Sequence, residues 1–379
     1  MAAWIFQPSS IYSVKSNHYS QLFLIKAMHT EDLIIEQKNG VGHIILNRPK
    51  ALNSINLAMV RSMHACLKKW ADDDSVNVVV VSGAGDRAFC AGGDIRTLYE
   101  SMKEGRSDHL TFFQEEFALN EYIYTYAKPY IAFIDGYVMG GGMGISQGAA
   151  YRIATERTKL SMPETAIGYF PDVGGSYFLS RCPDSIGIYL GLTGKSIQAQ
   201  DAVYSKLADW VMNSEHFPKL LESLEGLNSA QSVAPQIDAI LKSLGAVDHA
   251  TDSNFSRIGK QINECFSLDT VEAIEFALKK MEQGAPADWI AEALNKMSTN
   301  SPIAMSGTLR MIQAGKSLNL SQCFAMELVL AKHWMEVGDF IEGIRALIID
   351  KDNSPQWRYS KDELSPKELN RLLPELYPH

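Results

Sequence analysis

The sequence is short of the residues that build metal and redox sites. It has five cysteines in 379 residues, and no C-x-x-C occurs. Wide spacing of this kind predicts reduced, mostly buried thiols in a reducing compartment. The nine histidines include no pair at ligand spacing with a nearby carboxylate, so neither a metal nor another cofactor is expected. The cysteines are Cys66, Cys90, Cys182, Cys265 and Cys323.

Two further features of the sequence argue against whole classes of function. No apolar run reaches the roughly 18 residues that a membrane span needs, so no membrane partner is expected. The net charge of −9 disfavours a nucleic-acid partner. The chain has 46% hydrophobic residues, which suits a globular protein with a large core. The sequence does not decide whether the protein forms a homo-oligomer.

The first 30 residues differ from the rest. They contain no Asp, Glu or Arg, and their fixed positive charges are Lys15 and Lys26. A transit peptide is poor in acids but rich in Arg, so we interpret residues 1–30 as an irregular leader before a core that starts near residue 31. A cytoplasmic location follows from this interpretation. The alternative is the mitochondrial matrix, if residues 1–30 are a transit peptide.

Strands alternate with helices in the first half of the chain. Two β-prone runs at 33–37 and 41–46 flank Asn39-Gly40, which is a strong hairpin signal. Buried strands are predicted at 78–81 and 130–135, a short strand at 152–154, and helices at 56–72, 95–102, 110–127 and 145–150. Beyond residue 175 strand signals almost vanish, and helices are predicted at 198–204, 217–228, 234–244, 270–282, 287–297, 302–313 and 321–336. The sequence therefore predicts an α/β core at 31–200 and a helical C-terminal region at 201–379.

Three glycine-rich stretches invite a nucleotide-binding interpretation, and two of them fail. Residues 83–88 match G-x-G-x-x-A, but Gly92-Gly93 follows where a helix should run. Residues 194–196 resemble the end of a phosphate loop, but its first glycine would stand at Tyr189. The third stretch, residues 140–142, is Gly-Gly-Gly between a predicted strand and a helix. It indicates either close packing of the two elements or backbone approach to a ligand.

Residues 161–175 contain two acids in apolar surroundings. Glu164 and Asp172 stand among chain breakers, Gly168 and Pro171, that allow the chain to double back. Charged groups are rarely placed in such surroundings without a partner or a task. A short loop could bring both acids to one pocket, although each could instead cap a helix or pair with an Arg.

The glycine turns and the acids together indicate a catalytic site. Residues 90–94 (CAGGD), 140–142 and Pro163-Glu164 follow one another with strands between them. Glycine turns at the ends of adjacent strands could aim two N–H groups at one point, which makes an oxyanion hole. Glu164 would supply base or nucleophile chemistry beside it. Cys90 lies nearby, but without a neighbouring His it is interpreted as a packing residue.

These motifs resemble the crotonase (enoyl-CoA hydratase/isomerase) superfamily. The resemblance rests on residues 46–53 (LNRPKALN), 89–94 (FCAGGD), 136–142 (GYVMGGG) and 163–164 (PE). Within it, residues 162–175 (MPETAIGYFPDVGG), 114–117 (QEEF) and 339–357 are most similar to the 3-hydroxyisobutyryl-CoA hydrolase family. The resemblance implies a spiral of β-β-α turns with a C-terminal helical layer, and an acyl-CoA substrate.

The resemblance also implies roles for individual residues. Gly93 and Gly141 would form the oxyanion hole, Glu164 and Asp172 would be catalytic, and Glu116 would bind substrate together with Gly141, Glu164 and Asp172. The expected reaction is hydrolysis of the thioester of 3-hydroxyisobutyryl-CoA, and of 3-hydroxypropionyl-CoA, as in valine catabolism. Glu164 would attack the thioester to form an anhydride or deprotonate a water; the sequence is compatible with both.

One departure from the wider superfamily bears on the reaction. A hydratase carries a second catalytic glutamate two residues beyond its Gly-Gly-Gly run, and here that position is Gly144. Half of the carboxylate pair used in hydration is therefore missing. The alternatives left open are an enoyl-CoA hydratase or isomerase acting on another short acyl-CoA, and a non-catalytic acyl-CoA-binding protein.

Overall fold

The chain enters the fold as a hairpin at the edge of a six-stranded sheet. A computed structural model describes residues 31–373, in which β1 (Leu33–Lys38) and β2 (Val41–Leu46) pair antiparallel. Asn39 and Gly40 form the turn with φ of 46° and 83°, as the hairpin prediction requires. The sheet has the order β1-β2-β3-β5-β7-β9, and its pairs from β2 onward are parallel. The later strands are β3 (Val78–Gly83), β5 (Tyr130–Ile134), β7 (Tyr151–Ala154) and β9 (Trp210–Val211).

A second, three-stranded parallel sheet was missed by the sequence patterns. Its strands, in the order β4-β6-β8, are β4 (Ala88–Cys90), β6 (Tyr137–Met139) and β8 (Lys159–Ser161). Each is three residues long, which is too short for the alternation of apolar and polar side chains typical of a strand to be recognised. The chain adds one strand to the large sheet and then one to the small sheet, as β3-β4, β5-β6 and β7-β8. This repeat is a spiral of β-β turns, and the predicted α/β class is confirmed.

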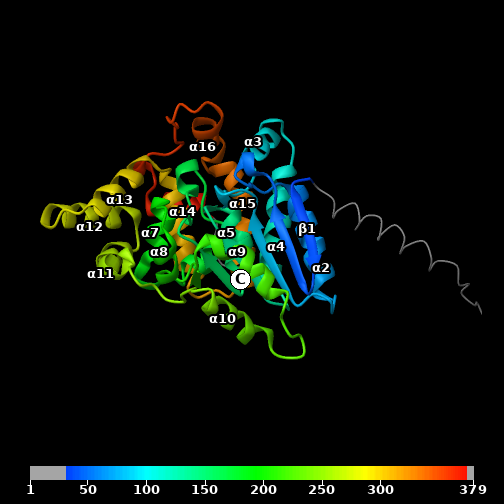
Figure 1. The fold of residues 1–379 in the computed structure, drawn as a ribbon. Coiled ribbons are helices and arrows are strands. Elements are labelled where there is room, and N and C mark those ends of the chain that lie inside the picture. Colours follow the sequence, from blue (N-terminus) through cyan, green and yellow to red (C-terminus); the bar gives the residue numbers. More distant parts are fainter. Residues whose placement is uncertain (1–30, 374–379) are drawn as a thin grey trace, which may run out of the picture.

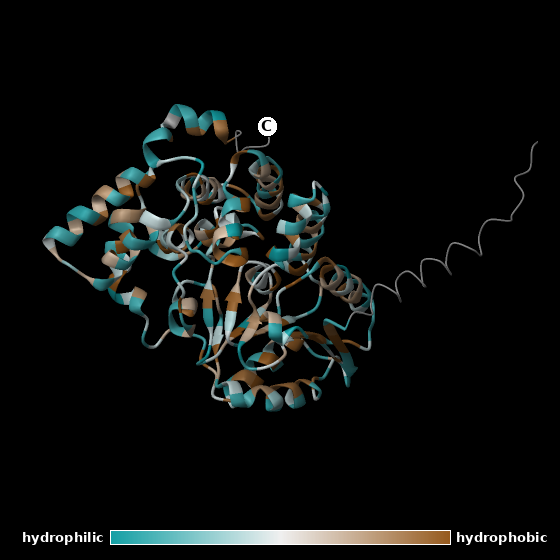
Figure 2. Ribbon diagram, turned by 90° about the horizontal axis from the view of Figure 1, so that it is seen from above, coloured by the Kyte–Doolittle hydropathy of each residue, from teal (hydrophilic) through white to brown (hydrophobic). Residues whose placement is uncertain are grey.

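The large sheet is buried on both faces. Alternate valines of β3 point to opposite sides, and all four are fully buried. Val79 and Val81 pack in the core that contains α2 (Leu57–Ala71) and α4 (Asp108–Tyr124). Val78 and Val80 pack in a second core with residues of α9 (Phe217–Leu224) and α10 (Val233–Ser243). Figure 2 shows the brown, apolar strands enclosed by helices whose outer surfaces are teal. A run of four valines fits a strand of this kind, buried on both faces.

Helices make up most of the chain after residue 175. Figure 1 shows α11, α12 and α13 at the opposite end of the molecule from the β1 hairpin. All seven helices predicted there are present, while α6, α7, α11, α16 and α17 were missed. In the first half, α5 begins at Gly141, four residues before the predicted helix start. The remaining helices are α3 (Ile95–Lys103), α5 (Gly141–Gln147), α6 (Gly175–Leu179), α7 (Ile186–Thr193), α8 (Ala199–Tyr204), α11 (Asn254–Phe266), α12 (Val271–Gly284), α13 (Asp288–Thr299), α14 (Pro302–Gly315), α15 (Leu320–Val337), α16 (Phe340–Ile344) and α17 (Pro366–Leu372).

No helix within residues 31–373 is long and apolar enough to cross a membrane. The predicted leader, residues 1–30, lies outside the described residues.

Candidate active site

One cavity brings together all five residues predicted for the site. It has a volume of about 360 Å³ and lies where the start of α3, α4, the start of α5 and the loop after β8 meet. Its walls also include aromatic and aliphatic side chains, so the acids face an apolar space. The predicted residues that line it are Gly93, Glu116, Gly141, Glu164 and Asp172.

The amides of Gly93 and Gly141 lie on facing segments of the cavity wall. Gly93 stands between β4 and α3, and Gly141 is the first residue of α5, where helix geometry leaves the N–H without an intrahelical acceptor. A Cβ built on Gly141 would lie 3.3 Å from the Gly93 nitrogen, and one on Gly92 would lie 3.8 Å from the Gly141 nitrogen. The two nitrogens are therefore close enough for one ligand oxygen to approach both.

The three glycines of residues 140–142 serve different purposes. A Cβ on Gly142 would lie 2.3 Å from the carbonyl oxygen of Cys90, so this glycine allows α5 to pack against β4. A Cβ on Gly140 would lie 3.0 Å from Oε1 of Glu164, and one on Gly141 would lie 2.5 Å from Oε1 of Glu116. These two glycines face the acids of the cavity. The close-packing interpretation is therefore confirmed for Gly142, whereas approach of a ligand to Gly140 and Gly141 stays a prediction.

Glu164 is a buried carboxyl at the cavity wall. It begins a 3-10 turn at Glu164–Ile167, directly after Pro163, and its residue surface is 6% exposed. Its Oε2 has no hydrogen-bond partner among the described residues. Burial raises the pKa of Glu164 to about 8, because the charged form loses its hydration. Such a group can take up a proton near neutral pH.

Glu116 reaches the same place from α4. It is 2% exposed, and its Oε1, next to Gly141, has no partner within the described part of the chain. Burial raises the pKa of Glu116 to about 8. An unpartnered carboxyl oxygen in an apolar cavity costs free energy unless a ligand supplies a hydrogen bond, so this position favours a polar ligand group.

Asp172 lies in the turn between Phe170 and α6. It is buried, and its pKa is raised well above the ordinary range by burial and by the negative charges of Glu116, Glu164 and Glu327. The backbone directly after it is unusual. Val173 has φ of 54°, a left-handed conformation that β-branched residues rarely adopt. Strain of this kind persists only where the surrounding structure enforces it.

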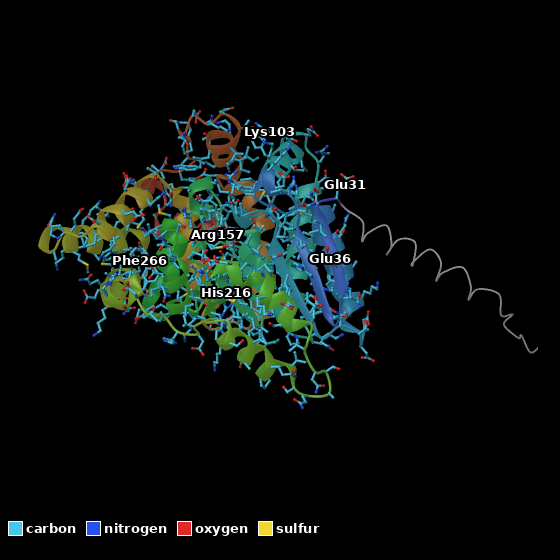
Figure 3. The ribbon with its side chains drawn as sticks, viewed as in Figure 1. Glu31, Glu36, Lys103, Arg157, His216 and Phe266 are labelled. Atoms are coloured by element: carbon cyan, nitrogen blue, oxygen red, sulfur yellow. The ribbon has the colours of Figure 1, made fainter. Side chains whose placement is uncertain are left out.

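Charged residues elsewhere in the fold are mostly at the surface. Glu36 of β1 and Lys103 of α3, both exposed, are labelled on the outside of the molecule in Figure 3. Five buried acids within residues 31–373 have raised pKa values and are therefore an exception: Glu116, Glu164, Asp172, Glu327 and Asp339. Buried acids of this kind are typical of catalytic sites.

Three residues near the site were missed from the sequence. Glu327 on α15 is fully buried and raises the pKa of Asp172. Tyr169 lines the cavity, and its hydroxyl lacks a partner among residues 31–373. Both side-chain polar atoms of Asn120 are likewise unpartnered within that range. The signal for Glu327 was available, since it is a single acid in the apolar stretch 326–331 of a helix.

Position 144 has no room for a carboxylate. A Cβ on Gly144 would lie 2.5 Å from Nδ2 of Asn120 and 2.8 Å from Cβ of Val173. Packing therefore explains why glycine stands at position 144, where a hydratase has a glutamate. The space that a side chain would need is filled by Asn120 and Val173.

Cys90 is a packing residue in the structure. Burial raises the pKa of its thiol to about 12, so the nucleophilic thiolate is disfavoured. Its sulfur accepts the N–H of Gly92 at 3.4 Å. In the described part of the chain, no group of three or more His, Cys, Asp or Glu side chains could hold a metal ion.

Comparison with known proteins identifies the family. The model of the enoyl-CoA hydratase/isomerase family matches residues 41–373. The chain is 38% identical to the mitochondrial 3-hydroxyisobutyryl-CoA hydrolase of Rattus norvegicus over 359 residues, which cover 94% of this chain and 92% of the relative. It is 41% identical to the protein of that name from Danio rerio over 331 residues, covering 87% and 85% of the two chains. The human protein of that name is 38% identical over 350 residues, covering 91% and 89%.

Solved structures share the fold over nearly the same range. An enoyl-CoA hydratase from Rhodobacter sphaeroides 2.4.1 is 35% identical with a TM-score of 0.81, covering 90% of this chain and 97% of that one. A carnitinyl-CoA dehydratase from Mycobacterium thermoresistibile is 34% identical with a TM-score of 0.83, covering 91% and 97%. The chain belongs to the enoyl-CoA hydratase/isomerase family and has the crotonase fold that its sequence motifs predicted.

Proposed function

We propose that this member of the enoyl-CoA hydratase/isomerase family hydrolyses the thioester of 3-hydroxyisobutyryl-CoA to the free hydroxy acid and CoA. The names of the curated relatives support this substrate. The observation that supports the proposal is that Gly93, Gly141 and three buried acids line one cavity of about 360 Å³. Thioester hydrolysis needs this combination of an oxyanion site and a proton acceptor.

The thioester oxygen binds between the amides of Gly93 and Gly141. These N–H groups belong to the rigid backbone and stabilise the negative charge that develops when the carbonyl carbon becomes tetrahedral. Glu164 lies beside Gly140. In the general-base route it takes a proton from a water whose oxygen bonds to the carbonyl carbon, and the C–S bond then breaks. In the covalent route its carboxylate oxygen bonds to that carbon first, and the C–S bond breaks to release the CoA thiolate. Water then hydrolyses the resulting anhydride.

Asp172 is suited to protonate the leaving group, the thiolate of CoA. Its pKa is raised by burial and by three neighbouring acids, which favours the protonated carboxyl. A protonated carboxyl can donate that proton as the thiolate of CoA leaves, and solvent then restores it. Rapid quench followed by mass spectrometry separates the two routes for Glu164, because only the covalent route leaves an acyl group on this side chain.

Glu116 gives the site its preference for a hydroxyacyl group. Its Oε1 is buried and without a partner among the described residues, and it lies next to Gly141, close to the proposed position of the thioester. The 3-hydroxyl of the substrate donates a hydrogen bond to it. A site that offers a buried acceptor to a hydroxyl discriminates against acyl groups that lack one. The same contact accommodates 3-hydroxypropionyl-CoA.

Hydration of a double bond is not favoured, although two structural relatives are named hydratase and dehydratase. Asn120 and Val173 fill the space that a carboxylate at position 144 would need. A crotonyl-CoA hydration assay is expected to give no activity above background.

The names of the curated relatives place those proteins in mitochondria. They favour the mitochondrial alternative for this chain over the cytoplasmic location expected from the sequence. Imaging of the full chain with a fluorescent protein at its C-terminus tests this, and a diffuse cytoplasmic signal would favour the original expectation.

A panel of three thioesters tests the function. Free thiol is measured with 3-hydroxyisobutyryl-CoA, 3-hydroxypropionyl-CoA and isobutyryl-CoA. We expect turnover of both hydroxyacyl esters and a kcat/KM about 100-fold lower or more for isobutyryl-CoA, since the buried acceptor then stays unpaired. Binding of all three esters without thiol release would instead identify a non-catalytic binding protein.

A further inference from the structure

Glu327 is a fully buried carboxylate that holds the backbone next to Asp172. It comes from the middle of α15, about 150 residues later in the sequence, and is 0% exposed. The N–H of Gly174 donates to its Oε2 at 2.8 Å, and the N–H of Ser176 donates to its Oε1 at 2.9 Å. The hydroxyl of Ser176 also donates to Oε1. These three donors fit an ionised carboxylate, which accepts only, better than a protonated one.

The segment that Glu327 holds is strained and carries Asp172. Val173 and Gly174 have φ of 54° and 90°. The N–H of Gly175 donates to the carbonyl oxygen of Asp172 at 2.7 Å, which closes the turn. A valine in the left-handed region relaxes unless its neighbours are fixed. Glu327 fixes them on the C-terminal side, through the residues immediately after Val173.

We propose that Glu327 is a positioning residue for Asp172, holding the strained turn of residues 172–176 so that the Asp172 carboxyl stays in the cavity beside Glu164. This inference rests on the role of Asp172 in the proposed function and extends it to a residue outside the cavity wall. Loss of the Glu327 carboxylate frees the Gly174 and Ser176 amides. The turn then relaxes, and Asp172 moves away from the leaving group.

The charge of Glu327 acts on the same acid. The titratable groups that face Asp172 are Glu116 from α4, Glu164 from its 3-10 turn, Tyr169 from the loop and Glu327 from α15. The carboxylates among them favour the protonated form of Asp172. Removing the charge at 327 therefore lowers the proton affinity of Asp172. Because Asp172 must be protonated to assist the leaving group, the basic limb of the dependence of kcat on pH then moves to lower pH. A role in folding alone does not move that limb.

A double-mutant cycle between the two acids tests the proposal. In Glu327→Gln the side-chain amide presents an NH₂ group where two backbone N–H groups need an acceptor. We expect kcat for 3-hydroxyisobutyryl-CoA to fall about 10- to 100-fold with KM within about 3-fold, as for a misplaced catalytic group. In the Asp172→Asn background the same change should cost less than about 2-fold, since two residues that act as a unit are not additive. Glu336→Gln, an exposed change on the same helix, is the matched control and should leave kcat unchanged.

Two further measurements keep the outcomes distinct. Ser176→Ala removes one hydrogen-bond donor to Glu327 but no charge, so it should lower kcat about 3- to 10-fold without moving the basic limb of the pH profile to lower pH. If Glu327→Gln does not fold, Ser176→Ala takes its place in the double-mutant cycle with Asp172→Asn. Hydrogen exchange at the Gly174 and Ser176 amides should accelerate in Glu327→Gln, whatever the substrate. If the wild-type protein releases no thiol, the proposed function is wrong, but hydrogen exchange still tests whether Glu327 holds the turn of residues 172–176. If the wild type is active and the losses from Glu327 and Asp172 multiply, or kcat of Glu327→Gln stays within 2-fold, the positioning role is wrong.

Discussion

The buried acids should make the protein less stable as the pH rises from about 6 to 9. Burial raises the pKa of Glu164 from 4.5 to about 8. In the unfolded chain this carboxyl loses its proton near pH 4.5, whereas the folded protein holds it until about pH 8. The folded state therefore binds more protons between these values, and stability falls as the pH rises. The contribution is fully present below about pH 4.5 and is lost as the pH passes about 8.

The size of the effect follows from this shift. One pKa unit corresponds to about 1.36 kcal/mol, so the free energy of unfolding falls by about 3 kcal/mol between pH 6 and 9 for this one group. A chain of 379 residues unfolds with an entropy of about 0.8 kcal/mol per kelvin, so the loss corresponds to about 4 °C in Tm. Glu164→Gln removes the titration and should make the dependence of Tm on pH shallower by this amount.

Thermal unfolding of the two proteins from pH 6 to 9 measures the difference in slope. The other buried acids are present in both proteins, so the comparison isolates the carboxyl at 164 together with its effect on the pKa of Asp172. Glu336→Gln, which changes an exposed carboxyl on α15, should keep the slope of the wild type. Parallel curves for wild type and Glu164→Gln would show that the carboxyl at 164 is hydrated in the folded protein, and the burial argument would be wrong.

Further predictions concern single residues of the site. Gly142→Ala should cost about 2–3 kcal/mol of stability in chemical denaturation, because its Cβ meets the Cys90 carbonyl oxygen at 2.3 Å. Gly141→Ala should cost less stability than Gly142→Ala, because its Cβ meets a side-chain end, Oε1 of Glu116, at 2.5 Å and backbone only at 3.3 Å. It should nevertheless lower kcat about 100-fold, and equal stability losses would contradict the division of the glycine run. Glu116→Gln should lower kcat/KM for 3-hydroxyisobutyryl-CoA about 10- to 100-fold and for isobutyryl-CoA less than 3-fold. Equal losses for the two esters would show that Glu116 does not bind the 3-hydroxyl. Cys90→Ala should retain kcat/KM within about 3-fold, whereas inactivation with an intact fold would make the thiol a participant.

The parts of the site that the sequence predicted are those encoded in short, continuous stretches. The glycine turns at Gly93 and Gly141 and the acid at Glu164 each stand beside a chain breaker or a buried strand, where local constraints are strong. Glu116 was assigned through the family resemblance, whereas Asp172 was singled out with Glu164 as an acid in apolar surroundings, and the structure places both at the cavity. Their roles stay predictions, as does the division of the chain near residue 200.

Other features depend on contacts between distant residues. The partners of Glu327 are backbone amides about 150 residues away, and no local pattern reveals such a pairing. The strands β4, β6 and β8 are three residues each, so their pairing partners rather than their composition define them. The helix α11 is a different case. Phe255, Ile258 and Ile262 recur at helical spacing, so this helix could have been predicted and was overlooked.

The central claim is that Glu164 performs the chemistry on a thioester held by the amides of Gly93 and Gly141. Release of free CoA from 3-hydroxyisobutyryl-CoA by Glu164→Gln, at a pH above 8 and with unchanged folding, tests this claim most directly. We predict a loss of about 10³-fold or more in kcat relative to wild type, because neither water nor the thioester then meets an activated carboxylate. Turnover within a few fold of the wild-type rate would contradict the mechanism.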